Sequence, residues 1–587
     1  MAVTAPETSF TRDVFGRYIC NTFDEARGSG PFDIVIIGGG TFGLALAENV
    51  FYRSKTFDNR LGTVPDDNNR PPNFRVLLLE AGPFLLNEHT QDIANFQLFP
   101  PDPPPKPGCP LPTTRQALIQ SGQDREAFLE AWGLPWNSQE PFGGLAYCLG
   151  GRSLYWGGWS PESLDTEMPT VPGGSITAQT LWPTTVVEDL RARFFIEAAE
   201  QTGVTVANDF INGVLHDHYR QAVYNLHTGG IPNAVPLNEL PDYSPFADAG
   251  LQARIAAPPY PGFVDSLKFD APLAVQIETR PGFFPFNKFS SMPLGISGTR
   301  EAFAEAGTDN ARKRLMVVPN CHVKRLTTRT YTLATGATVE EVVGIDTGNG
   351  FLDLSGPIGG NPNRRPVVVL ALGAIESARM ASNSVGGSVP NANLMGQNLM
   401  VHVRRNARIT APIPAGVVLN FQELSVLLVR CRTVINGTPV HFHLQITASA
   451  VPAGAGGNRS DALLFQNVPD IDQIQVFRNM PPGRVDVTIR AVGEMLPKPA
   501  NNTVTVPLNP ADLDEYLPPR HGEHRAGPRA GTVAGGDGQR HRRARGQPLR
   551  GRRPGRPRYD LSRVRDPADG QRLGRATLAI SRAPGGW

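Results

Sequence analysis

A short glycine-rich stretch near the N-terminus has residue types and a spacing suited to holding a diphosphate. Residues Gly38 to Gly43 read GGGTFG, and they follow directly on the apolar run Ile34 to Ile37. In such a stretch Gly38 permits a tight turn, Gly40 lets backbone N–H groups approach a pyrophosphate, and Gly43 lets the next helix pack closely on its strand. The helix expected from Phe42 onward directs its positive N-terminal end at the same anion. The pattern therefore predicts a nucleotide-binding strand–turn–helix unit.

A carboxylate stands at the end of the next apolar run. Arg75 to Leu79 reads RVLLL and predicts a second buried strand, and Glu80 follows it. An acid at this point accepts hydrogen bonds from the ribose hydroxyls of an adenine dinucleotide, and it disfavours a 2′-phosphate. The interval from the glycines exceeds the usual ~20 residues, because the polar segment Ser54 to Asn73 intervenes as a surface excursion. The alternative is that Glu80 only caps the strand.

A second glycine-rich stretch, Leu149 to Trp159, carries aromatic residues as well. It reads LGGRSLYWGGW, in which four glycines accompany a serine and two tryptophans. Exposed backbone beside aromatic side chains could form a surface on which a flat ring lies. The alternative is a glycine turn with ordinary aromatic packing.

In their order along the chain, GGGTFG, LLLEAG and GGRSLYWGG resemble the FAD-binding signatures of the glucose-methanol-choline (GMC) oxidoreductases. The third is most similar to the versions in pyranose oxidase and cholesterol oxidase. Two later stretches agree, because residues 366–377 resemble the family's A-G-A-x-x-S and residues 395–402 resemble its G-x-N-L-x-x-H. Residues 315–326 resemble the strand whose valine meets adenine. The cofactor contacts that the resemblance implies are Gly38, Gly40, Thr41, Gly43, Glu80, Gly150, Gly151, Ser153, Trp156, Gly157, Gly158, Val323 and Gly373.

The resemblance implies an α/β protein with a Rossmann-like FAD-binding domain and a second, α+β substrate domain built on an antiparallel sheet. Residues 30–165 and 296–410 would form the first domain, and residues 166–295 and 411–516 the second. Tyr155 stands where pyranose oxidase has a histidine bonded covalently to the flavin, so FAD is expected to be noncovalent. Trp156 stands where cholesterol oxidase has an asparagine.

The implied activity is oxidation of a CH–OH group of a sugar or other alcohol. A base takes the hydroxyl proton, hydride passes to the flavin, and oxygen or another acceptor takes the electrons. Two alternatives stay open. One is a catalytically inactive flavin-binding protein or the product of a damaged gene. The other is a nicotinamide-dependent dehydrogenase, which the presence of the stretch GGRSLYWGG disfavours.

The region assigned to the substrate domain contains a strong hairpin signal. Apolar runs at residues 424–435 and 438–448 flank Asn436-Gly437, and residues 485–489 alternate as a strand would. Along the second run His441, His443 and Gln445 share one face. This polar row either lines a substrate pocket or forms the solvated face of a sheet.

Composition limits the class of protein and its partners. The 587 residues include no apolar run of membrane-spanning length, and the first residues do not resemble a secretory signal, so a cytoplasmic protein is expected. Residues 1–520 hold 40 basic and 49 acidic side chains, so they lack the excess of positive charge that nucleic-acid binding requires. The five cysteines are widely spaced, so reduced thiols are expected and no metal site.

The family pattern stops near residue 517. Residues 501–516 resemble the lead-in to the family's catalytic region, where an H-x-x-G stretch and a later N-P or H-P supply the catalytic histidine and its partner. Beyond it Arg, Gly and Pro make up 35 of the last 67 residues, which predicts a disordered tail over 517–587. A frameshift is the favoured explanation, and an arginine-glycine tail that binds RNA or an acidic partner is the alternative. None of His521, His524 and His541 lies in a matching motif, so the catalytic residues are unknown.

Overall fold

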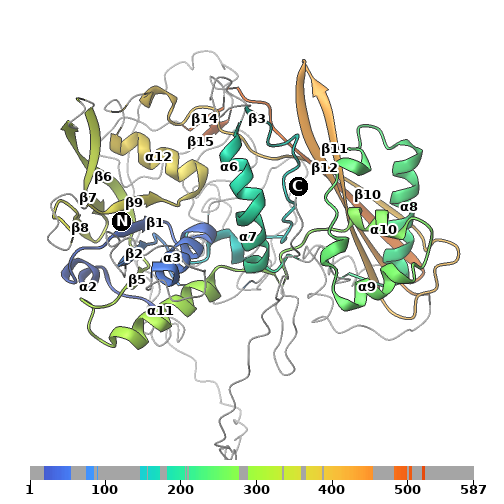
Figure 1. Cartoon of the computed structure of the whole chain (residues 1–587), viewed down its shortest axis with the longest axis horizontal. Coiled ribbons are helices and arrows are strands. Elements are labelled where there is room, and N and C mark those ends of the chain that lie inside the picture. The colour runs from blue at the N-terminus through green and yellow to red at the C-terminus, as the bar shows by residue number, and fades with distance from the viewer. Residues whose placement is uncertain are drawn as a thin grey trace, which may run out of the picture. The chain divides into compact units, whose positions relative to one another are not determined.

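A computed structural model describes residues 19–54, 74–84, 89, 146–154, 156–171, 182–204, 207, 211–275, 288–332, 336, 338–358, 365–385, 389, 391–453, 481–498, 502–504 and 519–521 (Figure 1). Contacts divide the chain into two units, Met1–Arg525 and Ala526–Trp587, and every described residue belongs to the first. The tail that is expected to be disordered, residues 517–587, lies almost entirely outside the described residues. Tyr155, on which the noncovalent linkage depends, lies outside them too.

A four-stranded parallel sheet carries the glycine-rich motifs. Its order is β5 (Leu315–Val318), β2 (Val76–Leu79), β1 (Ile34–Ile37) and β9 (Val367–Leu370). All four strands consist of Val, Ile, Leu and Met, and β1, β2 and β5 are almost entirely buried, as expected for a parallel sheet covered on both faces. The strands predicted at Ile34 to Ile37 and Arg75 to Leu79 are therefore confirmed, the second one residue shorter than expected.

Helices cover both faces of this sheet. One hydrophobic cluster joins β1 to α12 (Gly373–Val385) through Met380. The other joins β1 to α3 (Thr41–Ser54) and α11 (Met292–Ala306), which pack against each other. Figure 1 shows α12 and α11 on opposite sides of the strands. The fold is therefore of the α/β class that the sequence predicts.

Residues 315–326, which resemble a single strand, form parts of two strands in different sheets. The chain turns after β5 at Asn320, whose φ of +53° is in the left-handed region that asparagine tolerates. It continues as β6 (Val323–Thr332), which pairs antiparallel with β7 (Thr338–Thr347), and β7 pairs with β8 (Gly350–Asp353). The backbone N–H of Cys321 donates to Glu80 O, which fixes the turn against the end of β2.

A second sheet is antiparallel and contains the predicted hairpin. Its order is β10 (Val403–Pro412), β13 (Arg484–Gly493), β12 (Thr438–Val451) and β11 (Glu423–Ile435). Asn436 and Gly437 adopt φ values of +50° and +80°, as the turn of a two-residue hairpin requires. The hairpin prediction is confirmed, and so is the antiparallel sheet.

Helices pack on one face of the antiparallel sheet (Figure 1), where hydrophobic clusters join α8 to β11 and β12. The longest is α8 (Val214–Gly230), which contacts β11 and packs against α10 (Phe263–Ser266). Nearby in sequence are α9 (Ala249–Ala256) and the 3₁₀ segment η8 (Leu267–Phe269). The remaining elements are α2 (Phe23–Gly28), η3 (Gly151–Leu154), β3 (Thr170–Val171), β4 (Trp182–Pro183), α6 (Thr184–Asp189), the π-helical η5 (Leu190–Phe194), α7 (Phe195–Thr202), η6 (Leu237–Glu239), η7 (Ser244–Phe246), η9 (Ala392–Leu394), β14 (Asn502–Val504) and β15 (Pro519–His521). In the described part of the chain, no helix has the length and apolar character needed to cross a bilayer.

Candidate functional site

The two glycine-rich motifs meet backbone to backbone at the carboxyl end of β1. Gly150 N donates to Gly39 O at 2.8 Å. A Cβ added to Gly151 would lie 2.8 Å from the Cα of Gly40, so only glycine permits this approach. Motifs that are far apart in the sequence thereby form one continuous backbone surface.

The glycines of GGGTFG have distinct surroundings. A Cβ on Gly43 would lie 1.8 Å from Gly38 O, so α3 can reach the turn only with glycine at that position. Gly38 has a φ of +103°, and a Cβ there would lie 2.6 Å from Ala371 O. Among the described residues, by contrast, the atom nearest to a Cβ added at Gly40 is 4.0 Å away. Packing therefore dictates Gly38 and Gly43, while no described residue fills the space beside Gly40.

Glu80 lies at the tip of β2 and faces the same turn. Its Oε2 accepts a hydrogen bond from Gly39 N at 2.6 Å, and its Oε1 accepts one from Gly82 N at 3.0 Å. Burial raises the pKa of Glu80, and the backbone N–H groups of Gly82, Gly39 and Ala81 oppose this rise. Each carboxylate oxygen can accept a second hydrogen bond, so these contacts leave acceptor capacity for ribose hydroxyls. The predicted ribose contact stays a prediction.

The polar atoms of the second motif bond to neighbouring chain segments. The Ser153 hydroxyl donates to Gly150 O at 2.6 Å, and Ser291 N donates to the Ser153 oxygen at 3.1 Å. The Trp156 indole Nε1 donates to Phe289 O at 2.8 Å, and Gly158 O accepts from Ala274 N. These bonds hold residues 150–158 against the segment that leads into α11.

The other predicted contacts lie at separate places around the parallel sheet. Val323 begins β6 and is only 3% exposed, within the same hydrophobic cluster as β1. Gly373 begins α12 with a φ of +76°, and no atom of the described part of the chain lies within 4 Å of a Cβ added there. Thr41 and Gly157 lie within the two glycine motifs. A cofactor contact at each of these positions remains a prediction.

Two buried basic side chains beside the second motif were not anticipated. His89 is 2% exposed, and its Nε2 lies 2.8 Å from Trp156 O. A carbonyl only accepts, so Nε2 carries the ring proton. Burial, reinforced by Lys288, lowers the pKa of His89 to about 3, so the ring is neutral at pH 7. Lys288 is also buried, its stem passes 3.6 Å from a Cβ placed on Gly158, and burial lowers its pKa well below the usual value. Neither residue belongs to a sequence motif that could have signalled it.

The predicted polar row of β12 is not a simple solvated face. His441 is 8% exposed, and its Nε2 lies 3.1 Å from Thr166 Oγ1. Gln445 Nε2 lies 3.2 Å from His443 Nε2, and burial, then Arg430 and His402, lower the pKa of His443 to about 4. Arg430 of the same face pairs with Glu167 at 3.1 Å. Thr166 and Glu167 follow the second glycine motif in sequence, so they tie this face to it.

Comparison with known proteins gives a weak structural likeness. No family model and no curated protein matches the sequence. Among solved structures, the chain is similar to a new fungal aryl-alcohol oxidase, with 13% sequence identity and a TM-score of 0.29. The alignment covers 66% of this chain and 55% of the oxidase, so the chain spans about half the length of that protein.

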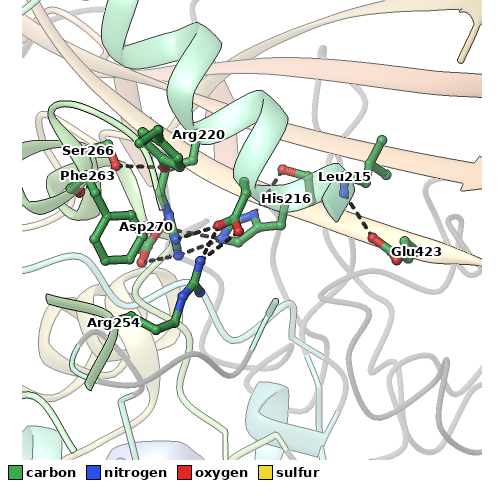
Figure 2. Close-up of polar contacts among 11 residues, drawn as sticks. Leu215, His216, Arg220, Arg254, Phe263, Ser266, Asp270 and Glu423 are labelled. Carbon is green, nitrogen blue, oxygen red and sulfur yellow. Dashed lines mark hydrogen bonds and ion pairs between the residues drawn. The ribbon is translucent and has the colours of Figure 1, made fainter. Parts of the chain in front are cut away.

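A second polar cluster lies under the antiparallel sheet, and Figure 2 shows Arg220 of α8 at its centre. Arg220 is fully buried and donates to both carboxylate oxygens of Asp270, at 2.7 and 2.8 Å. His216 Nε2 lies 3.0 Å from Arg220 Nη2, and His216 Nδ1 lies 3.0 Å from Ser425 Oγ of β11. A guanidinium only donates, so Nε2 accepts and the neutral ring carries its proton on Nδ1. The cluster fastens α8 to β11 and to the chain after η8. Among the described residues, no group of three metal-ligating side chains gathers here or elsewhere.

Acidification should destabilise this cluster through His216. Burial, and then Arg220, lower the pKa of His216 in the folded protein, so the unfolded chain binds this proton more readily. The contribution of neutral His216 to the free energy of unfolding is therefore fully present above the unfolded pKa of about 6.5. It is lost as the pH falls below that value, by up to about 1.4 kcal/mol per pH unit. Replacing His216 with glutamine should flatten the fall in unfolding free energy between about pH 7 and pH 5, measured by urea denaturation.

The matched control is His218→Gln, the same substitution two residues along α8, where the ring lies edge-on to Tyr219. It should keep the pH dependence of the parent protein. An equal flattening in both variants would show that His216 is not the group responsible.

Proposed function

We propose that this chain is an FAD-dependent oxidoreductase of the GMC type, which oxidises a CH–OH group of a sugar or other alcohol by hydride transfer to flavin. The observation that carries the proposal is the meeting of GGGTFG and GGRSLYWGG at the carboxyl end of β1, beside Glu80. Ligands of open α/β sheets bind at this end of the strands. The weak structural likeness to an aryl-alcohol oxidase gives no support to the pyranose oxidase or cholesterol oxidase branch.

The residues present fit a noncovalent FAD. The space beside Gly40 and the N–H groups at the start of α3, with Thr41, would hold the diphosphate. Glu80 would accept hydrogen bonds from the ribose, and Val323 and Gly373 would lie near the remaining nucleotide. Residues 150–158 would supply the surface for the flavin ring. When bound, FAD supplies a two-electron acceptor for the alcohol and passes the electrons to oxygen or another acceptor.

The side chains near the second motif would position the alcohol and limit water. His89 and Lys288 are buried beside Trp156 and Gly158, where they help to exclude solvent. The polar face of β12 supplies hydrogen-bonding groups for a polyol. The base that removes the hydroxyl proton is not assigned, because the histidine motif that the family resemblance implies is missing after residue 516.

The same missing motif favours a second candidate, a flavin-binding protein without catalytic activity. The absorption spectrum of the purified protein separates the two. The oxidoreductase should show the two visible flavin bands, and they should bleach when an alcohol substrate is added without oxygen. Bands that no alcohol bleaches would support the inactive protein, and a colourless protein that does not take up FAD would contradict both.

A further inference from the structure

The antiparallel sheet has two edge strands, β11 and β10, which differ in what covers them. Along the outer side of β11, Val235 N donates to Arg430 O at 2.9 Å, and Arg432 N donates to Asn233 O at 2.8 Å. These bonds close the edge of the sheet at β11. β10 forms the opposite edge, beyond β13.

Hydrogen bonds at the two ends of β13 determine which backbone groups of β10 point away from the sheet. Glu494 N donates to His441 O of β12, and Ile413 N donates to Gly483 O. Because backbone groups point to alternate sides along a strand, even-numbered residues of β13 bond to β12 and odd-numbered ones to β10. The register pairs odd-numbered residues of β13 with odd-numbered residues of β10. The N–H groups that point outward are therefore those of the even-numbered residues Arg404, Asn406, Arg408 and Thr410.

The outer edge of β10 is open to another strand. No backbone group of a described residue bonds to the four outward N–H groups. All residues of β10 except Ala411 are exposed. Native edge strands are often protected by a bulge or an internal proline, but β10 pairs with β13 without a register shift, and its proline is the last residue, Pro412. The strand thus presents a regular row of donors and acceptors to solvent.

The charges of β10 favour an acidic partner. Its charged residues are Arg404, Arg405 and Arg408, and it contains no acidic residue. Arg408 already pairs with Asp486 of β13 at 2.7 Å. Arg404 Nε donates to the Asn406 side chain at 3.3 Å, and Arg404 has no carboxylate partner among the described residues. Pairing β10 with a second copy of itself would gather arginines from both strands, and like charges across a pair are destabilising.

The two faces of β10 suit different side chains of a partner. Arg404 lies on one face, and Val403 and Ile409 lie on the other with Arg405 between them. Val403 and Ile409 are 55% and 56% exposed. Side chains of an added strand alternate between the same two faces. Acidic residues of that strand would lie beside Arg404, and its apolar residues would cover Val403 and Ile409.

We propose that the outer edge of β10 binds an extended segment of another protein, in which acidic and apolar residues alternate. The segment would add a fifth strand to the four-stranded sheet. Main-chain hydrogen bonds from the outward N–H groups supply affinity, and Arg404 selects the charge of the partner. This interaction is separate from the proposed redox chemistry and does not depend on it.

Fluorescence anisotropy tests the edge, using the full chain and a labelled peptide of alternating valine and glutamate. Asn406→Pro removes one outward N–H and places a proline ring in the path of the added strand, while Arg405 and Ala407 keep their pairing with β13. This variant should bind the peptide about tenfold more weakly or worse. Asn406→Ala is the matched control, because it removes the same side chain and keeps the N–H. Its affinity should stay within about twofold of the parent's.

Arg404→Gln tests the choice of charge without altering the backbone. It should weaken binding of the valine–glutamate peptide roughly two- to fivefold, the effect of losing an exposed ion pair. A peptide of alternating valine and lysine should bind the parent more weakly than the glutamate peptide does. The arginine-rich tail is the same in every variant, so differences between variants report on β10.

The edge site would be overturned if Asn406→Pro, folded with the parent's urea midpoint, bound the glutamate peptide as the parent does, or if the parent did not bind it. Unchanged binding by Arg404→Gln, or tighter binding of the lysine peptide, would overturn the acidic partner even if the proline variant did not fold. A dimer in analytical ultracentrifugation that Asn406→Pro converts to a monomer would also overturn it, because a second copy would then occupy the edge. None of these measurements requires FAD, so their failure is distinct from a failure of the proposed flavin chemistry.

Discussion

Replacing Gly43 with alanine should destabilise the amino-terminal βα unit by about 3 kcal/mol or more and abolish retention of FAD. The added Cβ would lie 1.8 Å from Gly38 O, and a backbone carbonyl cannot rotate away as a side chain can. Either α3 moves off its strand or the turn at Gly38 opens, and both displace the N–H groups proposed to hold the diphosphate. Urea denaturation measures the stability, and absorbance after desalting measures the bound flavin.

The matched control is Gly229→Ala, the same substitution inside α8. No atom of a described residue lies within 4 Å of a Cβ added at Gly229. This variant should be as stable as the parent or more stable by up to about 1 kcal/mol, since alanine favours helix more than glycine does. If Gly43→Ala retained both stability and FAD, the close approach of α3 to Gly38 would be wrong.

Restoring the reading frame after residue 516 should raise the rate of alcohol-dependent flavin reduction by roughly a hundred- to ten-thousandfold. That range is the usual contribution of a positioned general base, which the H-x-x-G histidine would supply. We propose a frameshift because residues 501–516 resemble the family's lead-in, and Arg, Gly and Pro then make up 35 of the last 67 residues. Anaerobic stopped-flow reduction of the corrected and present chains measures the difference.

A chain that ends after Tyr516 is the control for this experiment. It should reduce flavin no faster than the present chain, because neither contains the histidine motif. Stop codons early in both other frames would refute the frameshift, and so would a corrected chain that is no faster than the present one. The arginine-glycine tail would then be a genuine segment, with RNA or an acidic protein as its partner.

Local sequence predicted the elements whose formation depends on near neighbours. The apolar runs that form β1 and β2 were recognisable because strands of a covered parallel sheet need no alternation. Asn436-Gly437 predicted its hairpin because few other dipeptides adopt two consecutive positive φ angles. Alternation along β12 likewise placed His441 and His443 on one face, which the register confirms.

Sequence reasoning reached less far where distant segments meet. The break at Asn320 depends on hydrogen bonds to the end of β2, which residues 315–326 alone do not reveal. His89 and Lys288 owe their burial to packing around Trp156 and Gly158, and nothing in their own sequence neighbourhoods signals it. The ion pair of Arg430 with Glu167 likewise joins residues that no motif connects.

The most direct test of the proposed function is the amount of FAD that the folded protein retains. The chain with its reading frame restored is incubated with FAD, desalted and denatured with acid, and the released flavin is measured against protein. A tyrosine at position 155 would form no histidyl link to a flavin, so the proposed noncovalent cofactor predicts about one FAD per chain, all released into the supernatant. A folded, restored chain that retains no FAD would contradict the proposed cofactor, and the redox function with it.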